Sequence, residues 1–173
     1  WKETEKQPTI EKWNEVAKRY EELAENYKKA GVEKGANICI LNSKQAYNNA
    51  DWKETEKQPT IEKWNEVAKR YEELAEDYKK AGDEKESNIC ILKSKQAYVY
   101  AALKEARNEF TAESWNEVSK CYSEVAEACE KMADGESDVN EANSYRAMAK
   151  EYMEKANMYK QYAQILAKLT KDI

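Results

Sequence analysis

A tandem internal repeat is the feature of this sequence that most constrains its fold. The segment TIEKWNEVAKRYEELAENYKKAG begins at Thr9. A second copy with one substitution begins 51 residues later, at Thr60, and a diverged third copy begins at Thr111. A unit that is copied in tandem usually cannot bury its apolar surface alone, and neighbouring copies supply the missing contacts. We therefore expect three similar units that pack against one another.

Eight substitutions separate the first two copies when residues 1–51 are aligned with residues 52–102. We expect most of these positions to lie at the protein surface or at helix ends. The third copy keeps the register from Trp115 to Tyr122 and then drifts, as the terminal copy of an array often does. The eight pairs are Asn26/Asp77, Val32/Asp83, Gly35/Glu86, Ala36/Ser87, Asn42/Lys93, Asn48/Val99, Asn49/Tyr100 and Asp51/Ala102.

The amino-acid composition predicts an all-α protein. Helix breakers are scarce, with 4 Gly and 2 Pro in 173 residues, whereas Ala, Glu and Lys are abundant. Charged residues make up 36% of the chain, but the net charge is only -5 and the sequence contains 12 Tyr and 5 Trp. Disordered chains combine few aromatic residues with a strong charge imbalance, so a packed helical core is expected here.

Each unit is predicted to contain two helices. The first helix begins after a threonine that can serve as the N-cap, at Thr9, Thr60 and Thr111. It ends at a glycine, where a left-handed residue commonly terminates a helix, at Gly31, Gly82 and Gly135. The second helices are expected at about residues 33–55, 84–108 and 138–168.

The two helices of a unit differ in their apolar patterns. In the first helix, Trp13, Tyr20 and Tyr27 recur every seven residues beside Val16 and Leu23, which predicts a helix that is buried on one side. The second helix instead carries a stripe of small residues, which would allow close approach to its own partner helix. The stripe consists of Cys39, Ser43, Ala46 and Ala50.

The last helix has a heptad pattern in which small and large residues alternate. We expect it to pack on the third unit as a capping helix. A helix that self-associates through the same seam is the alternative. The seam consists of Ala142, Ala149, Ala156 and Ala163 with Tyr145, Tyr152, Tyr159 and Leu166.

The spacing Trp13-x2-Val16-Ala17-x2-Tyr20 resembles the start of the tetratricopeptide repeat (TPR). The second and third units repeat this spacing from Trp64 and from Trp115, and Ser43-x3-Tyr47-x2-Ala50 is similar to the pattern of the family's second helix. A TPR unit has about 34 residues, whereas this unit recurs every 51, so each helix would be about two turns longer.

The resemblance implies a right-handed αα-hairpin solenoid, a TPR-like superhelix, with about three helix pairs and a long C-terminal capping helix. We expect a single repeat domain over residues 1–173, with units at about 9–59, 60–110 and 111–173. Residues 1–8 are expected to be the end of a preceding, missing helix. Because the chain opens on a repeat boundary without Met, we interpret it as an excised or engineered fragment.

The first helix of each TPR unit lines a concave groove, and the resemblance implies the same arrangement here. An Asn can hydrogen-bond a peptide main chain and a Lys can bind a carboxylate, so these types could hold an extended peptide. The alternative is that they are solvated surface residues that were copied by duplication. The predicted groove residues are Asn14, Lys18, Glu22, Asn65, Lys69, Glu73, Asn116, Lys120 and Glu124.

No motif for catalysis, metal binding or cofactor binding is present. The sequence has no His, no CxxC pair and no Gly-rich phosphate loop, so we expect neither an enzyme nor a bound cofactor or metal. Its mild acidity argues against nucleic acid, and no apolar run approaches the roughly 20 residues that cross a bilayer. We expect Cys39, Cys90, Cys121 and Cys129 to be reduced core residues, which favours a cytoplasmic location.

The repeat architecture favours a scaffold that binds a protein or peptide segment. One alternative is a designed or artificially duplicated helical scaffold with no natural ligand. Another is a structural element that self-associates, either head to tail through an exposed Trp1 or through the C-terminal helix.

Overall fold

Six α-helices make up almost all of the computed structural model, which describes residues 9–170. No strand occurs in this range, so the predicted all-α class is confirmed. The prediction for residues 1–8 falls outside the described residues. The helices are α1 (Ile10–Lys29), α2 (Glu33–Lys57), α3 (Ile61–Lys80), α4 (Glu84–Glu109), α5 (Ala112–Gly135) and α6 (Val139–Leu169).

The predicted threonine caps begin the first helix of each unit. The hydroxyl oxygens of Thr9, Thr60 and Thr111 accept backbone N–H groups at 3.3, 3.1 and 3.1 Å. Such a bond satisfies one of the N–H groups that the first turn of a helix leaves without a partner. At Thr111 the cap is reciprocal, because the Ser114 hydroxyl oxygen also accepts the Thr111 N–H.

Glycine ends α1 and α3 as predicted, but it does not end α5 in the same way. Gly31 and Gly82 have φ angles of 74° and 81°, a left-handed conformation that glycine adopts without a steric penalty. Gly135 is instead the last helical residue of α5, and Glu136 leaves the helix in extended conformation. α5 thus ends at the predicted glycine, but the left-handed conformation expected there is wrong, because the chain passes through extended backbone to reach Asp138, the N-cap of α6.

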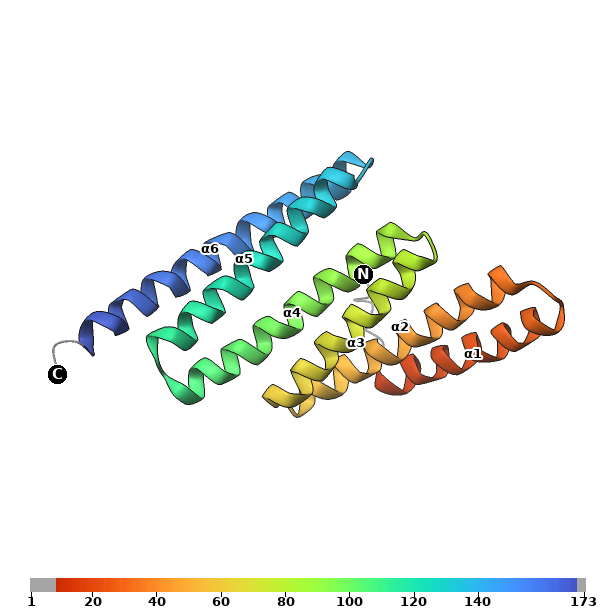
Figure 1. Ribbon diagram of the computed structural model, residues 1–173, viewed down its shortest axis with the longest axis horizontal. Coiled ribbons are helices and arrows are strands. Elements are labelled where there is room, and N and C mark those ends of the chain that lie inside the picture. The colour runs from red at the N-terminus through yellow and green to blue at the C-terminus, as the bar shows by residue number, and fades with distance from the viewer. Residues whose placement is uncertain (1–8, 171–173) are drawn as a thin grey trace, which may run out of the picture.

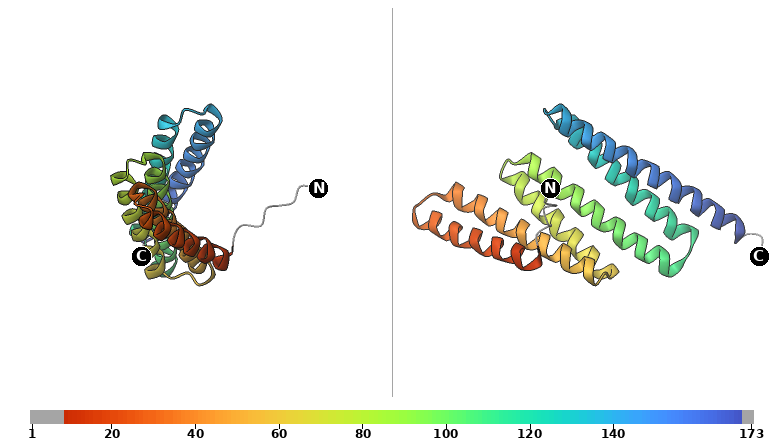
Figure 2. Two further views of the ribbon diagram at one scale, coloured as in Figure 1. Left: turned by 90° about the vertical axis from the view of Figure 1, so that its right-hand side faces the viewer. Right: turned by 180° about the vertical axis from the view of Figure 1, so that it is seen from behind.

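Close backbone contacts occur only between helices that are next to each other in the chain. Within residues 9–170, contacts join α1 with α2, α2 with α3, α3 with α4, α4 with α5, and α5 with α6. Figures 1 and 2 show the same order in space, with α1 and α6 at opposite ends of the row. Side chains also reach the next helix but one, since Gln96 of α4 donates to the Tyr152 hydroxyl of α6 at 3.0 Å and Lys93 of α4 donates to Asn49 of α2 at 2.6 Å. Among the described residues, α1 has α2 alone as a neighbour.

Two apolar clusters form the core. One lies between α2, α3 and α4, and it is built on Trp64, Tyr71 and Tyr78 of α3, which are at most 4% exposed. The other joins α4, α5 and α6 around Trp115 and Tyr122. The buried residues of α1, by contrast, are small: Ala17 and Ala24.

The small residues of α2 and α6 are buried, as their patterns predict. The heptad alanines of α6 face inward together with Tyr159, which stacks on Trp115 and Tyr122 of α5 at centroid distances of 5.4 and 5.5 Å. The Ser119 hydroxyl also donates to the Ala156 carbonyl at 2.8 Å. Because the seam packs on α5, self-association through it would require α6 to separate from α5.

Candidate functional site

The nine residues predicted to line a groove all lie on α1, α3 and α5, and none of them is buried. Six are exposed and three are half-buried, the latter being Asn14, Asn65 and Glu124. The three helices do not touch one another in the described part of the chain, because α2 separates α1 from α3 and α4 separates α3 from α5. The structure thus repeats the same surface on three helices without bringing the three sets into direct contact.

Acidic neighbours offset part of the positive charge on this surface. On α5, Lys120 forms an ion pair with Glu117 at 3.3 Å, and Glu124 forms one with Lys95 of α4 at 3.0 Å. The hydrogen bond to Glu117 raises the pKa of Lys120, so the ammonium group stays charged. Lys69 is exposed on the middle helix, and it forms no ion pair among residues 9–170.

Polar side chains hold α2 against α3, and we call this contact the first joint. Asp51 forms an ion pair with Arg70, and the Asn48 side-chain amide donates to the Arg70 carbonyl at 3.2 Å. The Tyr71 hydroxyl donates to Asn49 Oδ1 at 2.7 Å. Burial raises the pKa of Tyr71, so the phenol remains protonated and able to donate this bond.

A second group of polar contacts extends the first joint towards the end of α3. The Tyr78 hydroxyl donates to Gln45 Oε1 at 2.8 Å, and Lys44 pairs with Asp77 at 2.7 Å. Lys93 of α4 donates to Asn49 Oδ1 at 2.6 Å, and burial lowers the pKa of this lysine. The first joint therefore depends on hydrogen-bond partners that only particular residue types can supply.

Apolar side chains, beside the ion pair of Lys95 with Glu124, hold α4 against α5, and we call this contact the second joint. Val99, Ala102 and Leu103 of α4 are buried in the cluster that α5 and α6 share. In the repeat alignment Ala102 replaces Asp51, and Cys121 of α5 replaces Arg70. The second joint therefore lacks both the acidic and the basic residue of this ion pair.

Four of the eight substitutions between the first two copies lie on the outer faces of α2 and α4, at or beside these joints. The expectation of surface or helix-end sites is wrong for two of them, since Asn48, Val99 and Ala102 are 8%, 4% and 7% exposed, whereas Tyr100 is 45% exposed. The physical reason is that α2 must match α3, whereas α4 must match the different surface of α5. The linked change from Asp51 and Arg70 to Ala102 and Cys121 is the sequence signal that could have revealed this.

The outward face of α1 departs from the prediction of a helix that is buried on one side. Val16, Leu23 and Tyr27 are 36%, 41% and 37% exposed, and we call these three residues the α1 face. Their counterparts Val67, Leu74 and Tyr78 in α3 are 4%, 2% and 3% exposed. The difference arises because α3 lies between α2 and α4, whereas α1 has only α2 beside it among residues 9–170.

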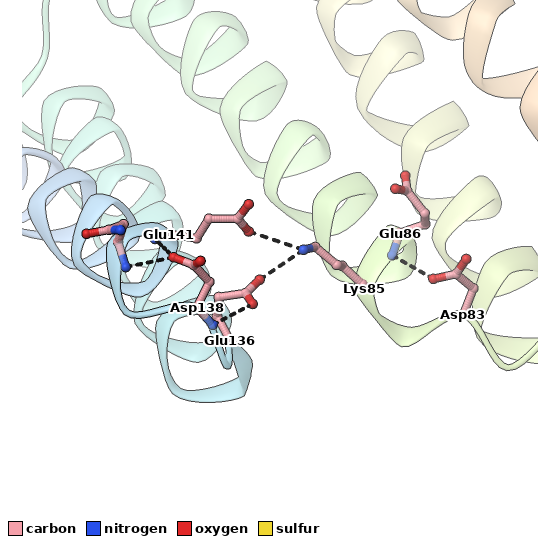
Figure 3. A network of polar contacts seen from close by, with 7 residues as sticks. Asp83, Lys85, Glu86, Glu136, Asp138 and Glu141 are labelled. Carbon is pink, nitrogen blue, oxygen red and sulfur yellow. Dashed lines mark hydrogen bonds and ion pairs between the residues drawn. The ribbon is translucent and has the colours of Figure 1, made fainter.

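A network of charged groups ties the start of α4 to the connection between α5 and α6 (Figure 3). Lys85 Nζ lies 3.0 Å from a carboxylate oxygen of Glu136 and 3.2 Å from one of Glu141. The Asp138 backbone N–H also donates to Glu136 at 3.1 Å, and this bond together with Lys85 lowers the pKa of Glu136 to about 2. The network links the second and third hairpins at this end, and it adds modestly to their apolar contact because Lys85 and Glu141 are more than half exposed.

No group of three His, Cys, Asp or Glu side chains is placed to hold a metal ion in residues 9–170. None of the helices in this range is long and apolar enough to cross a membrane. The four cysteines are free thiols, and three of them are buried. Comparison with protein-family models, with curated proteins and with solved structures finds no match to this chain. The TPR resemblance therefore rests on the spacing of residues alone.

Proposed function

We propose that this protein is an interaction scaffold, a TPR-like array of helical hairpins that binds a peptide or protein segment. The order of contacts supports a repeat array: among the described residues, close backbone contacts join only helices adjacent in the chain, and side chains reach no further than the next helix but one, whereas a closed bundle also brings its first and last helices together. In this proposal the hairpins continue one another as a right-handed solenoid. The segment binds across α1, α3 and α5.

The recurrence of an Asn and a Lys at the same unburied positions of α1, α3 and α5 carries this proposal. The two residues are four positions apart, as in Asn65 and Lys69, so their side chains lie on one face of the helix. The third copy keeps both as Asn116 and Lys120, although it has diverged at many nearby positions. An amide can pair with main-chain groups of an extended ligand, and an ammonium group can bind a carboxylate.

The ligand class that best fits this surface is a peptide with an acidic tail. Lys69 supplies an exposed positive charge on the middle helix that no acidic residue of the described chain neutralises by an ion pair. The nearby Glu73 is exposed as well, so we expect modest affinity that falls as the salt concentration rises. The free thiols favour a reducing, cytoplasmic setting for such binding.

A peptide array with variable acidic C-terminal tails tests the proposal. Lys69→Glu should abolish capture of acidic-tailed peptides, because the variant places a negative charge where the carboxylate would bind. Lys79→Glu makes the same charge change near the end of the same helix, away from the predicted groove, and it should retain capture. Equal binding by the wild-type chain and by Lys69→Glu would refute a peptide site on this surface.

A further inference from the structure

The helices α1 and α3 have nearly the same sequence but different surroundings. Residues 10–29 and 61–80 differ only at Asn26, where α3 has Asp77. The apolar face of α3 is covered by α2, yet the equivalent α1 face is more than one-third exposed. Identical side chains in the same helical register therefore form a buried joint in one place and an open surface in the other.

The first joint shows which chemistry covers this type of face. The outer side of α2 presents Asp51 to Arg70, and it presents amide oxygens of Asn49 and Gln45 to the hydroxyls of Tyr71 and Tyr78. Trp52, which follows directly in α2, packs edge-on against Trp64 with ring centroids 5.0 Å apart. All of these α3 groups have an identical counterpart in α1.

We propose that the α1 face is a docking site for one further helical hairpin of this same repeat, which covers it with a helix of the α2 type. This inference is independent of the proposed peptide surface, because it concerns different side chains. Arg19, the counterpart of Arg70, has 74% of its side chain exposed and pairs with Glu15 in its own helix at 2.5 Å. Arg70 likewise contacts Glu66 in its own helix while it pairs with Asp51, so Arg19 can accept a second carboxylate.

Other surfaces of the described chain fit the α1 face less well. The outer face of α2 in a second copy is already covered by its own α3. When α6 is aligned with α4 from their first residues, Val139 and Glu84, the exposed Glu154 and Met158 of α6 match the buried Val99 and Leu103 of α4. Two α1 faces packed together would offer Tyr27 none of the amide partners that Tyr78 has on α2.

Charge complementarity adds a specific expectation. At the first joint Lys44 pairs with Asp77 at 2.7 Å, and α1 has the neutral Asn26 at the corresponding position. A docked α2-type helix would therefore lack this ion pair. Asn26→Asp should strengthen docking by a few fold, the usual effect of a partly exposed ion pair.

The test extends the full chain at its N-terminus by a second copy of residues 1–51. The added Asp51 then precedes Trp1 just as it precedes Trp52 in the chain, so the repeat register continues across the junction. A thiol placed by Leu23→Cys, with Cys121→Ser to remove the one native thiol that is not buried, reports cover of the α1 face, because Cys39, Cys90 and Cys129 are buried and react slowly. Alkylation is followed by mass spectrometry of the intact chain.

We expect the thiol at position 23 to react at least about tenfold more slowly in the extended chain than in the parent chain. Lys69→Cys, at an exposed site on α3, should react equally fast in both. Extension with residues 52–102 instead is the mismatched control, because it presents the α4-type face, and it should protect position 23 less. Adding Asn26→Asp to the matched extension should slow the reaction further.

Several outcomes would overturn the proposal. These are unchanged reactivity in the extended chain, and equal protection by both extensions. Protection in the parent chain that grows with protein concentration would assign the face to a second copy. Protection in the parent chain that is lost on deleting residues 1–8 would assign it to that segment. If the extended chain does not fold, the peptide of residues 33–57 added to the Leu23→Cys chain should slow alkylation, and its Asp51→Ala form should do so less.

Discussion

The chain contains a matched pair of leucines that measures what a neighbouring helix contributes to stability. Leu23 and Leu74 lie in the same local sequence, RYEELAE, so helix propensity and local contacts are equal for both. Leu74 is 2% exposed in the cluster between α2, α3 and α4, whereas Leu23 is 41% exposed on the α1 face. Truncation of each residue to Ala isolates the difference in tertiary packing.

The expected magnitudes follow from burial. Leu74→Ala removes a fully buried side chain and leaves a cavity, so the free energy of unfolding should fall by about 3 kcal/mol. Leu23→Ala removes a side chain that is little more than half buried and leaves an open notch that water fills, so the loss should be about 1 kcal/mol. The difference of about 2 kcal/mol corresponds to roughly a thirtyfold change in the unfolding equilibrium constant.

Equilibrium unfolding in urea provides the assay. Circular dichroism follows total helix, and fluorescence follows the tryptophans, which occur in all three hairpins, so the coincidence of the two signals tests two-state behaviour. A variant with an unchanged m-value but a lower midpoint has lost native stability. Equal losses for the two variants would refute the reasoning, because they would mean that the α1 face is covered as fully as the face of α3.

Three further predictions concern titration and the joints. Burial raises the pKa of Cys90 to about 12, so at pH 8 a variant that keeps only this thiol should react with a disulfide reagent roughly a thousandfold more slowly when folded than in urea. The pKa of Glu136 is lowered to about 2 from an ordinary value of 4.5, so its contribution to stability is present above pH 4.5 and is lost as the pH falls towards 2. Between pH 2 and pH 6, the free energy of unfolding should therefore depend less on pH in Glu136→Gln than in the wild type. A double-mutant cycle with Asp51→Ala and Arg70→Cys should give a coupling of about 1 kcal/mol, because the pair is partly exposed, and additive losses would contradict the ion pair.

Local signals in the sequence predict the helices well. The caps at Thr9, Thr60 and Thr111 and the glycines at Gly31 and Gly82 act within one helical turn, so their effect does not depend on the rest of the fold. Gly135 fails as a left-handed terminator because the conformation there depends on how the chain reaches the next cap.

Burial at the ends of the row could not be predicted from sequence. Residues 10–29 and 61–80 are almost the same string, yet Leu23 and Leu74 differ in exposure because a helix covers one and not the other. The groove residues illustrate the same limit. Their presence on the first helices and their exposure follow from the hydrophobic pattern, but whether α1, α3 and α5 present one surface depends on the intervening α2 and α4.

The residues that join α2 to α3 and α4 to α5 make the hairpins of this protein non-interchangeable, although their sequences are similar. Exchanging the second helices of the first two units would place Ala102 opposite Arg70 and Asp51 opposite Cys121. Arg70 would then lose its acidic partner, and Asp51 would lose its basic one. Permuted arrangements of the same units would therefore be penalised electrostatically. The contact surfaces thus specify the same order of hairpins that the covalent chain imposes.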